Sequence, residues 1–150
     1  MIHRKRAIRI CAFLLALNLM FIWGNSLLSA NASKAISDWF ADLLPDREET
    51  PVSMETETKI LRKTAHFIEF TVLGFLLSWM MFLLQKQRGR ALWLGILAAC
   101  ADETIQIFVP GRGPGWKDVL IDAGGVAAGM ILLWFGYAIV RKIRNTQFGG

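Results

Sequence analysis

Long apolar runs divide the chain into segments that a lipid bilayer would accept. Four runs occupy about residues 7–28, 65–84, 91–109 and 119–140. Each is close to the roughly 20 residues that a helix needs to cross about 30 Å of hydrocarbon. The pattern predicts an all-α polytopic membrane protein, a four-transmembrane-helix bundle, with residues 1–150 forming a single domain. The composition agrees, because 54% of the residues are hydrophobic and the mean hydropathy is +0.40.

The first run and the loop after it each allow two interpretations. A basic start and the A-x-A pattern at Ala30–Ala32 fit a signal peptide, but the run exceeds the usual core of about 7–15 residues. We therefore expect a retained span. The loop begins with KAISDWFADLL, whose apolar residues share one helical face up to Pro45. This predicts a short amphipathic helix, either on the outer membrane surface or packed over the mouth of the bundle.

Lysine and arginine residues gather in three short blocks beside the apolar runs. The net charge is +5, from 17 Lys and Arg against 12 Asp and Glu. The blocks are Arg4, Lys5, Arg6 and Arg9, then Lys86, Arg88 and Arg90, then Arg141, Lys142 and Arg144. Because basic flanks face the cytoplasm, we expect a multi-pass protein of the cell membrane with both termini cytoplasmic. Residues 29–62 and 110–117 then lie outside, and the distribution predicts no nucleic-acid partner.

Polar side chains inside and between the later runs fall at the outer end of this predicted bundle. They are Lys63, His66, Glu69, Asp102, Glu103, Gln106, Arg112, Lys117, Asp118 and Asp122. A charged side chain at the bilayer centre costs about 2.5–3.5 kcal/mol on insertion scales. At about 1.5 Å of rise per residue, three segments deliver these groups to one layer in the outer third of the membrane. A chain that keeps so many charges there must pair them, hydrate them or use them.

Helical spacing places these polar residues on shared faces. Asp118 and Asp122 are four residues apart, and Glu103 and Gln106 are three apart, so each pair lies on one face. Gly125 and Gly129 continue the face of Asp122 as a stripe of small residues, which lets a neighbouring helix approach closely. We therefore expect the polar face of the fourth run to be its packed face.

Three segments between Lys63 and Gly129 carry motifs in a fixed order: RKTAHFIEFTVLGFLL, DETIQIFVPGRGPGWKD and DVLIDAGGVAAG. They resemble the Lys-x-x-His-x-x-Glu, Glu-x-x-Gln…Pro-Gly-Arg and Asp-x-x-x-Asn…Gly segments of the VanZ-like membrane proteins. Asp122 departs from that pattern, because it stands where the family has Asn, and it adds a charge. The resemblance implies a small multi-span protein of the bacterial cell envelope. The family's namesake is associated with resistance to the lipoglycopeptide antibiotic teicoplanin.

Two functional interpretations of the polar layer stay open. As an enzyme, the protein would use His66 with Glu103 or Asp118 in general acid–base catalysis, with Arg112 stabilising an oxyanion or a phosphate. As a binding protein, it would recognise an envelope lipid, a lipoglycopeptide or a partner protein. The residues assigned to binding are Lys63, Glu69, Gln106, Arg112 and Asp122.

A structural interpretation competes with both, because interhelical polar contacts alone can hold a bundle together. Lys63 and Glu69 are six residues apart and cannot pair along one helix, so we expect their partners on the third and fourth runs. Transport is a further alternative, and a homo-oligomer is left open. No zinc-like ligand spacing occurs, so we predict no metal and no cofactor; a site built from His66 and carboxylates is the metal alternative.

Overall fold

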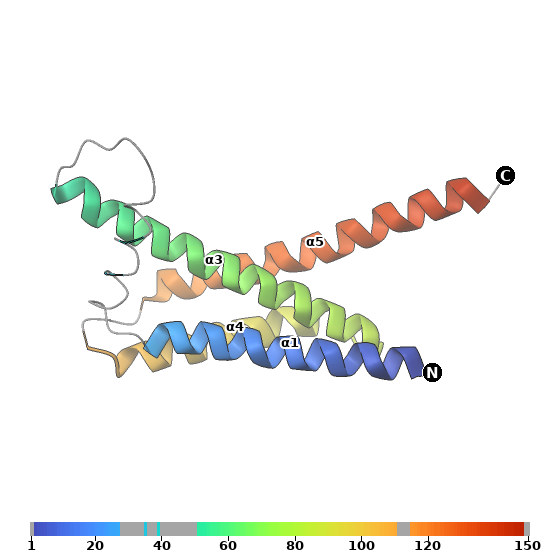
Figure 1. Ribbon diagram of the computed structural model, residues 1–150, viewed down its shortest axis with the longest axis horizontal. Helices are drawn as coiled ribbons and strands as arrows, with labels where there is room; N and C mark the ends of the chain where they lie inside the picture. The colour runs from blue at the N-terminus through green and yellow to red at the C-terminus, as the bar shows by residue number, and fades with distance from the viewer. Residues whose placement is uncertain (1, 28–34, 36–38, 40–50, 111–114, 149–150) are drawn as a thin grey trace.

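The computed structural model describes residues 2–27, 35, 39, 51–110 and 115–148, with side chains left aside in 51–59 and 147–148. The described residues form four α-helices and no strand: α1 (Ile2–Leu27), α3 (Pro51–Leu84), α4 (Gly89–Ile107) and α5 (Trp116–Phe148). Consecutive helices alternate in direction, so the start of α1, the α3–α4 connection and the end of α5 lie toward one side (Figure 1). The predicted all-α membrane bundle is confirmed. The predicted amphipathic helix over residues 34–44 lies outside the described residues, apart from positions 35 and 39.

Three helices are long and apolar enough to cross a membrane: α1, the Ile60–Leu84 part of α3 and the Trp116–Thr146 part of α5. The fourth helix, α4, has 19 residues and therefore spans about 28 Å. Three charged residues, Arg90, Asp102 and Glu103, lie within it. Two helices exceed their apolar runs, since α3 begins at Pro51 and α5 continues to Phe148. Proline is well suited to the first turn of a helix.

A tight turn joins α3 to α4. Gln85 takes a left-handed conformation with φ of 55°. Its N–H donates to Phe82 O at 3.2 Å, and the N–H of Lys86 donates to Met81 O at 2.9 Å. These two bonds form a Schellman motif, which satisfies carbonyls at the end of α3. The turn directs α4 back along α3 in the opposite direction.

The closest helix packing is between α3 and α5, which cross near their centres (Figure 1). A Cβ atom added to Gly125 would lie 2.6 Å from Phe67 O, and one added to Gly129 would collide with Thr71 O. Backbones approach this closely only where side chains are absent. The predicted stripe of small residues on the packed face of α5 is therefore confirmed.

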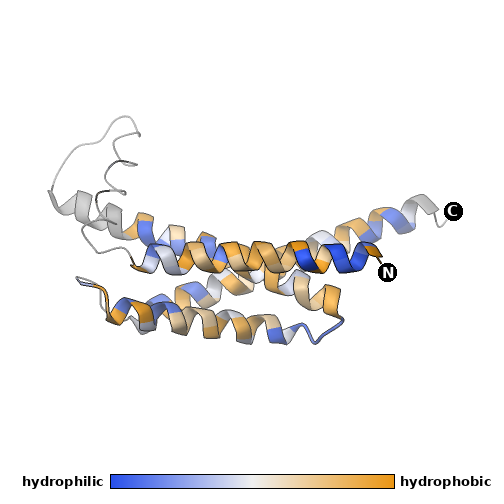
Figure 2. Ribbon diagram, turned by 60° about the horizontal axis from the view of Figure 1, so that its bottom comes forward, coloured by the Kyte–Doolittle hydropathy of each residue, from blue (hydrophilic) through white to orange (hydrophobic). Residues whose placement is uncertain are grey.

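The buried core is small, and the outer surface is apolar. One cluster joins all four helices through Ile22, Phe70, Leu73, Ala99 and Val126. Large apolar side chains also cover the outside, including Phe13, Trp93, Leu97, Ile131 and Phe135. Hydrophobic residues extend along the middle of the helices, and hydrophilic residues gather toward their ends (Figure 2). This distribution is typical of helices that face lipid, where exposed apolar side chains are favourable.

Candidate functional site

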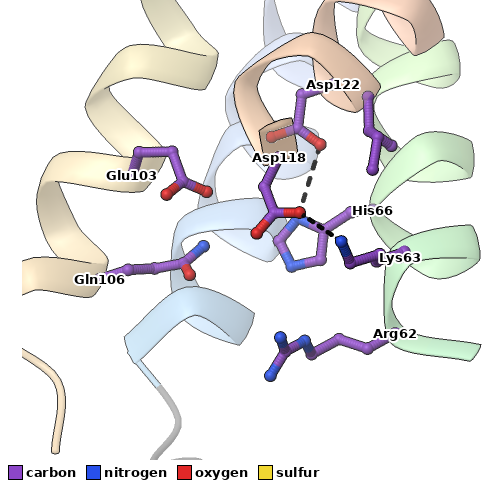
Figure 3. Close-up of a pocket in the computed structure, with 8 residues that line it drawn as sticks. Arg62, Lys63, His66, Glu103, Gln106, Asp118 and Asp122 are labelled. Atoms are coloured by element: carbon purple, nitrogen blue, oxygen red, sulfur yellow. Dashed lines mark ion pairs between the residues drawn. The ribbon is translucent and has the colours of Figure 1, made fainter. Parts of the chain in front are cut away.

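Side chains from α3, α4 and α5 surround one polar pocket where α3 enters the bundle and α5 begins (Figure 3). The lining residues are Arg62, Lys63, His66, Glu103, Gln106, Asp118, Ile121 and Asp122. We call this region the acidic end, defined by Asp102, Glu103, Asp118 and Asp122. The enclosed space is about 20 Å³, which is room for about one water molecule or ion. Any larger ligand must therefore remain at the mouth.

An ion pair between α3 and α5 forms one side of the pocket. Lys63 Nζ lies 2.9 Å from Asp118 Oδ1, and both side chains are partly exposed (Figure 3). Asp118 is in the first turn of α5, where the helix dipole favours a negative charge. A pair with this exposure contributes about 1 kcal/mol or less to stability. Its chief effect is to fix the position of a cation and a carboxylate at the mouth.

Glu103 connects the end of α4 to the start of α5. Its side chain is buried, and its Oε2 accepts a hydrogen bond of 2.7 Å from the N–H of Gly115. A Cβ atom at position 115 would lie 2.8 Å from Asp118 Oδ2. Glycine at this position therefore lets two carboxylates from different helices approach the same short segment of backbone.

Two lining residues of the pocket, His66 and Asp122, meet Asp102, which lies just outside the lining. His66 Nδ1 lies 3.9 Å from Asp102 Oδ2 and 3.9 Å from Asp122 Oδ1. Both aspartates are fully or almost fully buried. Asp102 Oδ2 also accepts a hydrogen bond of 2.9 Å from Gln106 Nε2, which lies 3.5 Å from Ser26 Oγ of α1. All four helices thus contribute to this region.

Several buried carboxylate oxygens have no hydrogen-bond partner within the described part of the chain. They are Asp102 Oδ1, Glu103 Oε1 and Asp122 Oδ2. An unsatisfied buried polar group costs about 1–3 kcal/mol, and more if it is charged. Such a cluster, with one imidazole beside it, has the donors needed to bind a cation or exchange a proton.

The family model described as VanZ/LLP1 matches residues 8–140. The chain belongs to the VanZ/LLP1 family. The match extends over parts of all four helices, so it includes the whole pocket. No curated protein and no solved structure is significantly similar to the chain.

Most of the residues predicted from sequence lie around the pocket of this VanZ/LLP1 protein. Six line it: Lys63, His66, Glu103, Gln106, Asp118 and Asp122. Arg112 lies outside the described residues. Lys117 does not line the pocket, and its Nζ lies 5.8 Å from the centre of the Trp116 ring.

Two expected pairings differ from the structure. The predicted acid–base partners of His66 were Glu103 and Asp118, but its ion-pair contacts are with Asp102 and Asp122. Residue counting brought these residues to the same end of the bundle, but it could not give the rotation of each helix about its axis. The partner of Lys63 is on α5 as expected, whereas Glu69 Oε1 accepts a hydrogen bond of 2.8 Å from Asn25 Nδ2 of α1. The expectation for Glu69 omitted the first helix.

The sequence placed Asp102 in the polar layer without a catalytic or binding role, and it did not single out Arg62. A signal for Asp102 was present, because Asp102 and Gln106 are four residues apart and hence share a helical face. Glu103 and Gln106, which are three residues apart, also share a face, so spacing alone could not favour Asp102 over Glu103. For Arg62, the only indication was its position beside Lys63, one residue before the predicted motif.

Proposed function

We propose that this VanZ/LLP1 protein binds the polar headgroup of an envelope lipid or lipoglycopeptide at the outer face of the bacterial cell membrane. The observation that carries this proposal is that two buried carboxylates, Glu103 and Asp122, line one small cavity. A third buried carboxylate, Asp102, lies 3.9 Å from His66, which also lines the cavity. Small residues are sufficient for close helix packing in a membrane, so packing alone does not require buried carboxylates. The whole of residues 1–150 would act as one domain.

The pocket suits a ligand with both anionic and hydrogen-bond-donating parts. Arg62 and Lys63 at the mouth would meet a phosphate or carboxylate. Glu103 and Asp118 would accept hydrogen bonds from hydroxyl or amino groups. The enclosed volume admits only one small group, so the bulk of a headgroup would stay at the membrane surface with its chains in the bilayer.

The proposal places both termini in the cytoplasm and the pocket outside, supported by the three blocks of Lys and Arg. Single cysteines introduced at Ser53 or Gly113 should then react with a membrane-impermeant thiol reagent in intact cells. A cysteine at Gln147 should react only after the cells are lysed. The native Cys11 and Cys100 are replaced by serine in all variants. Labelling of position 147 in intact cells would reverse the orientation and place the pocket in the cytoplasm.

The functional test uses the neutral isosteres Glu103→Gln and Asp118→Asn. Both should be produced normally and melt within a few degrees of the wild type, because shape and most hydrogen bonds are kept. We expect them to abolish the envelope phenotype, measured as protection of a sensitive strain against teicoplanin. The matched control is Lys142→Gln at the opposite end of the bundle, which removes a charge and should keep protection.

A structural role is the second candidate, and specific contacts favour it. Asn25–Glu69, Lys63–Asp118 and Glu103–Gly115 each join two different segments. If this were the whole role, both isosteres would retain full protection in the same assay. An enzyme would behave differently again, since Glu103→Gln would abolish protection while binding of a labelled lipoglycopeptide stayed intact.

A further inference from the structure

His66, Asp102 and Asp122 come from three helices and meet beside the pocket, whose lining includes His66 and Asp122. One ligand atom of each lies within 4.8 Å of the other two. We infer that these three side chains bind one divalent first-row transition-metal cation, of the Zn²⁺ or Mn²⁺ type, against the wall of the pocket. The ligand atoms would be His66 Nδ1 and one carboxylate oxygen from each aspartate.

The spacing of these donors is close to that of a coordination shell. His66 Nδ1 lies 3.9 Å from an oxygen of each aspartate. Neighbouring donors around a tetrahedral Zn²⁺, at bond lengths of about 2.0–2.1 Å, lie about 3.4 Å apart. Side-chain rotations of Asp122 and His66 would have to close about half an ångström at His66 and up to about 1.4 Å elsewhere in the cluster.

The electrostatics of the cluster call for a cation. Asp102 and Asp122 are 0% and 1% exposed. Each has one carboxylate oxygen without a hydrogen-bond partner, and no Lys or Arg in the described helices forms an ion pair with either. Buried carboxylates are stabilised when they are paired or coordinate a metal. A bound dication would balance two negative charges that no Lys or Arg of the described helices pairs with.

A second layer of contacts already orients one of the proposed ligands. Gln106 Nε2 donates to Asp102 Oδ2 at 2.9 Å and lies 3.5 Å from Ser26 Oγ. Metal-binding carboxylates are commonly held by such outer hydrogen bonds. Gln106 and Ser26 therefore act as positioning residues, which hold Asp102 in place on the side facing His66.

The donor set selects among cations. One imidazole nitrogen with two carboxylate oxygens suits Zn²⁺, Mn²⁺ or Fe²⁺, whereas Ca²⁺ prefers six to eight oxygen ligands. Mg²⁺ favours oxygen ligands, so an imidazole ligand makes it a poorer match. Three protein ligands leave a coordination position open toward the pocket.

This inference adds to the headgroup site, and the part that concerns the ligand rests on the proposed function. A phosphate oxygen of the headgroup would occupy the open position on the cation. Cation binding itself requires no lipid, so the two proposals can fail separately.

The direct test is metal titration of the detergent-solubilised 150-residue chain after treatment with EDTA. We expect one equivalent of Zn²⁺ or Mn²⁺ to bind and the melting temperature to rise with cation concentration. Co²⁺ should give visible absorption bands, which His66→Ala shifts because a nitrogen ligand is lost. Absence of saturable binding to the wild-type chain would overturn the inference, whatever happens to the variants.

Matched variants separate coordination from general negative charge. Asp122→Asn and His66→Ala should each weaken Zn²⁺ binding at least about tenfold. Asp118→Asn removes a charge from the same pocket but no proposed ligand, and should change the affinity less than threefold. Equal losses for Asp118→Asn and Asp122→Asn would show a diffuse acidic attraction and contradict the site.

A final comparison separates this site from the headgroup proposal. Binding of anionic phospholipid vesicles to the chain is measured with and without Zn²⁺. Stronger binding with Zn²⁺, lost in Asp122→Asn, supports both proposals together. One-equivalent Zn²⁺ binding with no effect on vesicles keeps the cation site and removes its role in headgroup recognition.

Discussion

The two ends of the helix bundle carry opposite charges, which are largely buried at one end and exposed at the other. At the acidic end, Asp102, Glu103 and Asp122 are buried between helices, and Glu103 and Asp122 line a pocket of about 20 Å³. At the basic end, defined by Arg88, Arg141 and Lys142, the charged groups line an open groove of about 490 Å³. Charge that is exposed costs little, whereas charge that is buried must be compensated. The charged groups of the acidic end therefore lower the stability of the fold unless they are compensated.

The basic end also shows how a cation is accommodated without a carboxylate. The Arg88 guanidinium lies 3.6 Å from the centre of the Trp134 ring. Trp134 and Tyr137 pack edge to face at 5.9 Å between ring centroids. Such cation–π and aromatic contacts keep the guanidinium near the membrane surface at no cost in desolvated charge. These contacts also join different segments, since Arg88 precedes α4, Phe82 lies on α3 and Trp134 lies on α5. Unlike the contacts of the acidic end, they involve no buried carboxylate.

The sharpest test of this contrast compares two glycines of α5. Gly129 lies where α5 packs on α3, and a Cβ atom added there would collide with Thr71 O. Gly136 lies closer to the basic end, and a Cβ atom added there would meet no atom within 4 Å. Gly129→Ala should destabilise the protein by about 3 kcal/mol, because the obstacle is backbone and overpacking is costly. Gly136→Ala should be neutral or stabilise by up to about 1 kcal/mol through helix propensity. Thermal unfolding in detergent measures both, and equal effects would mean that the two halves are not differently packed.

A smaller effect is expected from removing one polar contact at the acidic end. Gln106→Leu leaves Asp102 without its 2.9 Å hydrogen bond from Gln106 Nε2. We expect a loss of about 1–3 kcal/mol, because a buried carboxylate then loses a donor. The readout is again the free energy of unfolding, followed with and without added Zn²⁺.

The matched change at the basic end should be the mildest. Arg88→Leu removes a cation that stacks on Trp134 in an open groove. A cost of about 0.5–1 kcal/mol is expected. A larger loss for Arg88→Leu than for Gln106→Leu would invert the contrast between the ends and show that the basic groove is the more tightly coupled region.

The sequence predicts features that depend on neighbouring residues better than features that depend on contacts between helices. Leu84 ends both the second apolar run and α3, because local hydropathy and the turn at Gln85 act together. The convergence of polar residues at one end followed from counting residues along helices of known rise. Both features can be predicted without knowing which helices are in contact.

The pairings could not be predicted, because they depend on the rotation and neighbours of each helix. Asn25 bonds to Glu69 because α1 packs against α3, which no spacing within either segment reveals. The ion-pair contact between Asp102 and His66 was missed for a similar reason, since adjacent residues of α4 point about 100° apart. The proposed metal ligands likewise come from α3, α4 and α5, so no local ligand motif exists to be found.

The length of α4 has a consequence for the membranes in which this protein would work. With 19 residues, α4 is close to the thickness of an ordinary hydrocarbon core, while Asp102 and Glu103 lie near its end. Hydrophobic mismatch costs fractions of a kcal/mol per ångström and is relieved by tilting or local thinning of the bilayer. A thicker bilayer would draw the two carboxylates toward the acyl chains, and a thinner one would bring them closer to water. Acyl-chain length should therefore tune how accessible the pocket is, making lipid composition itself a control on the site.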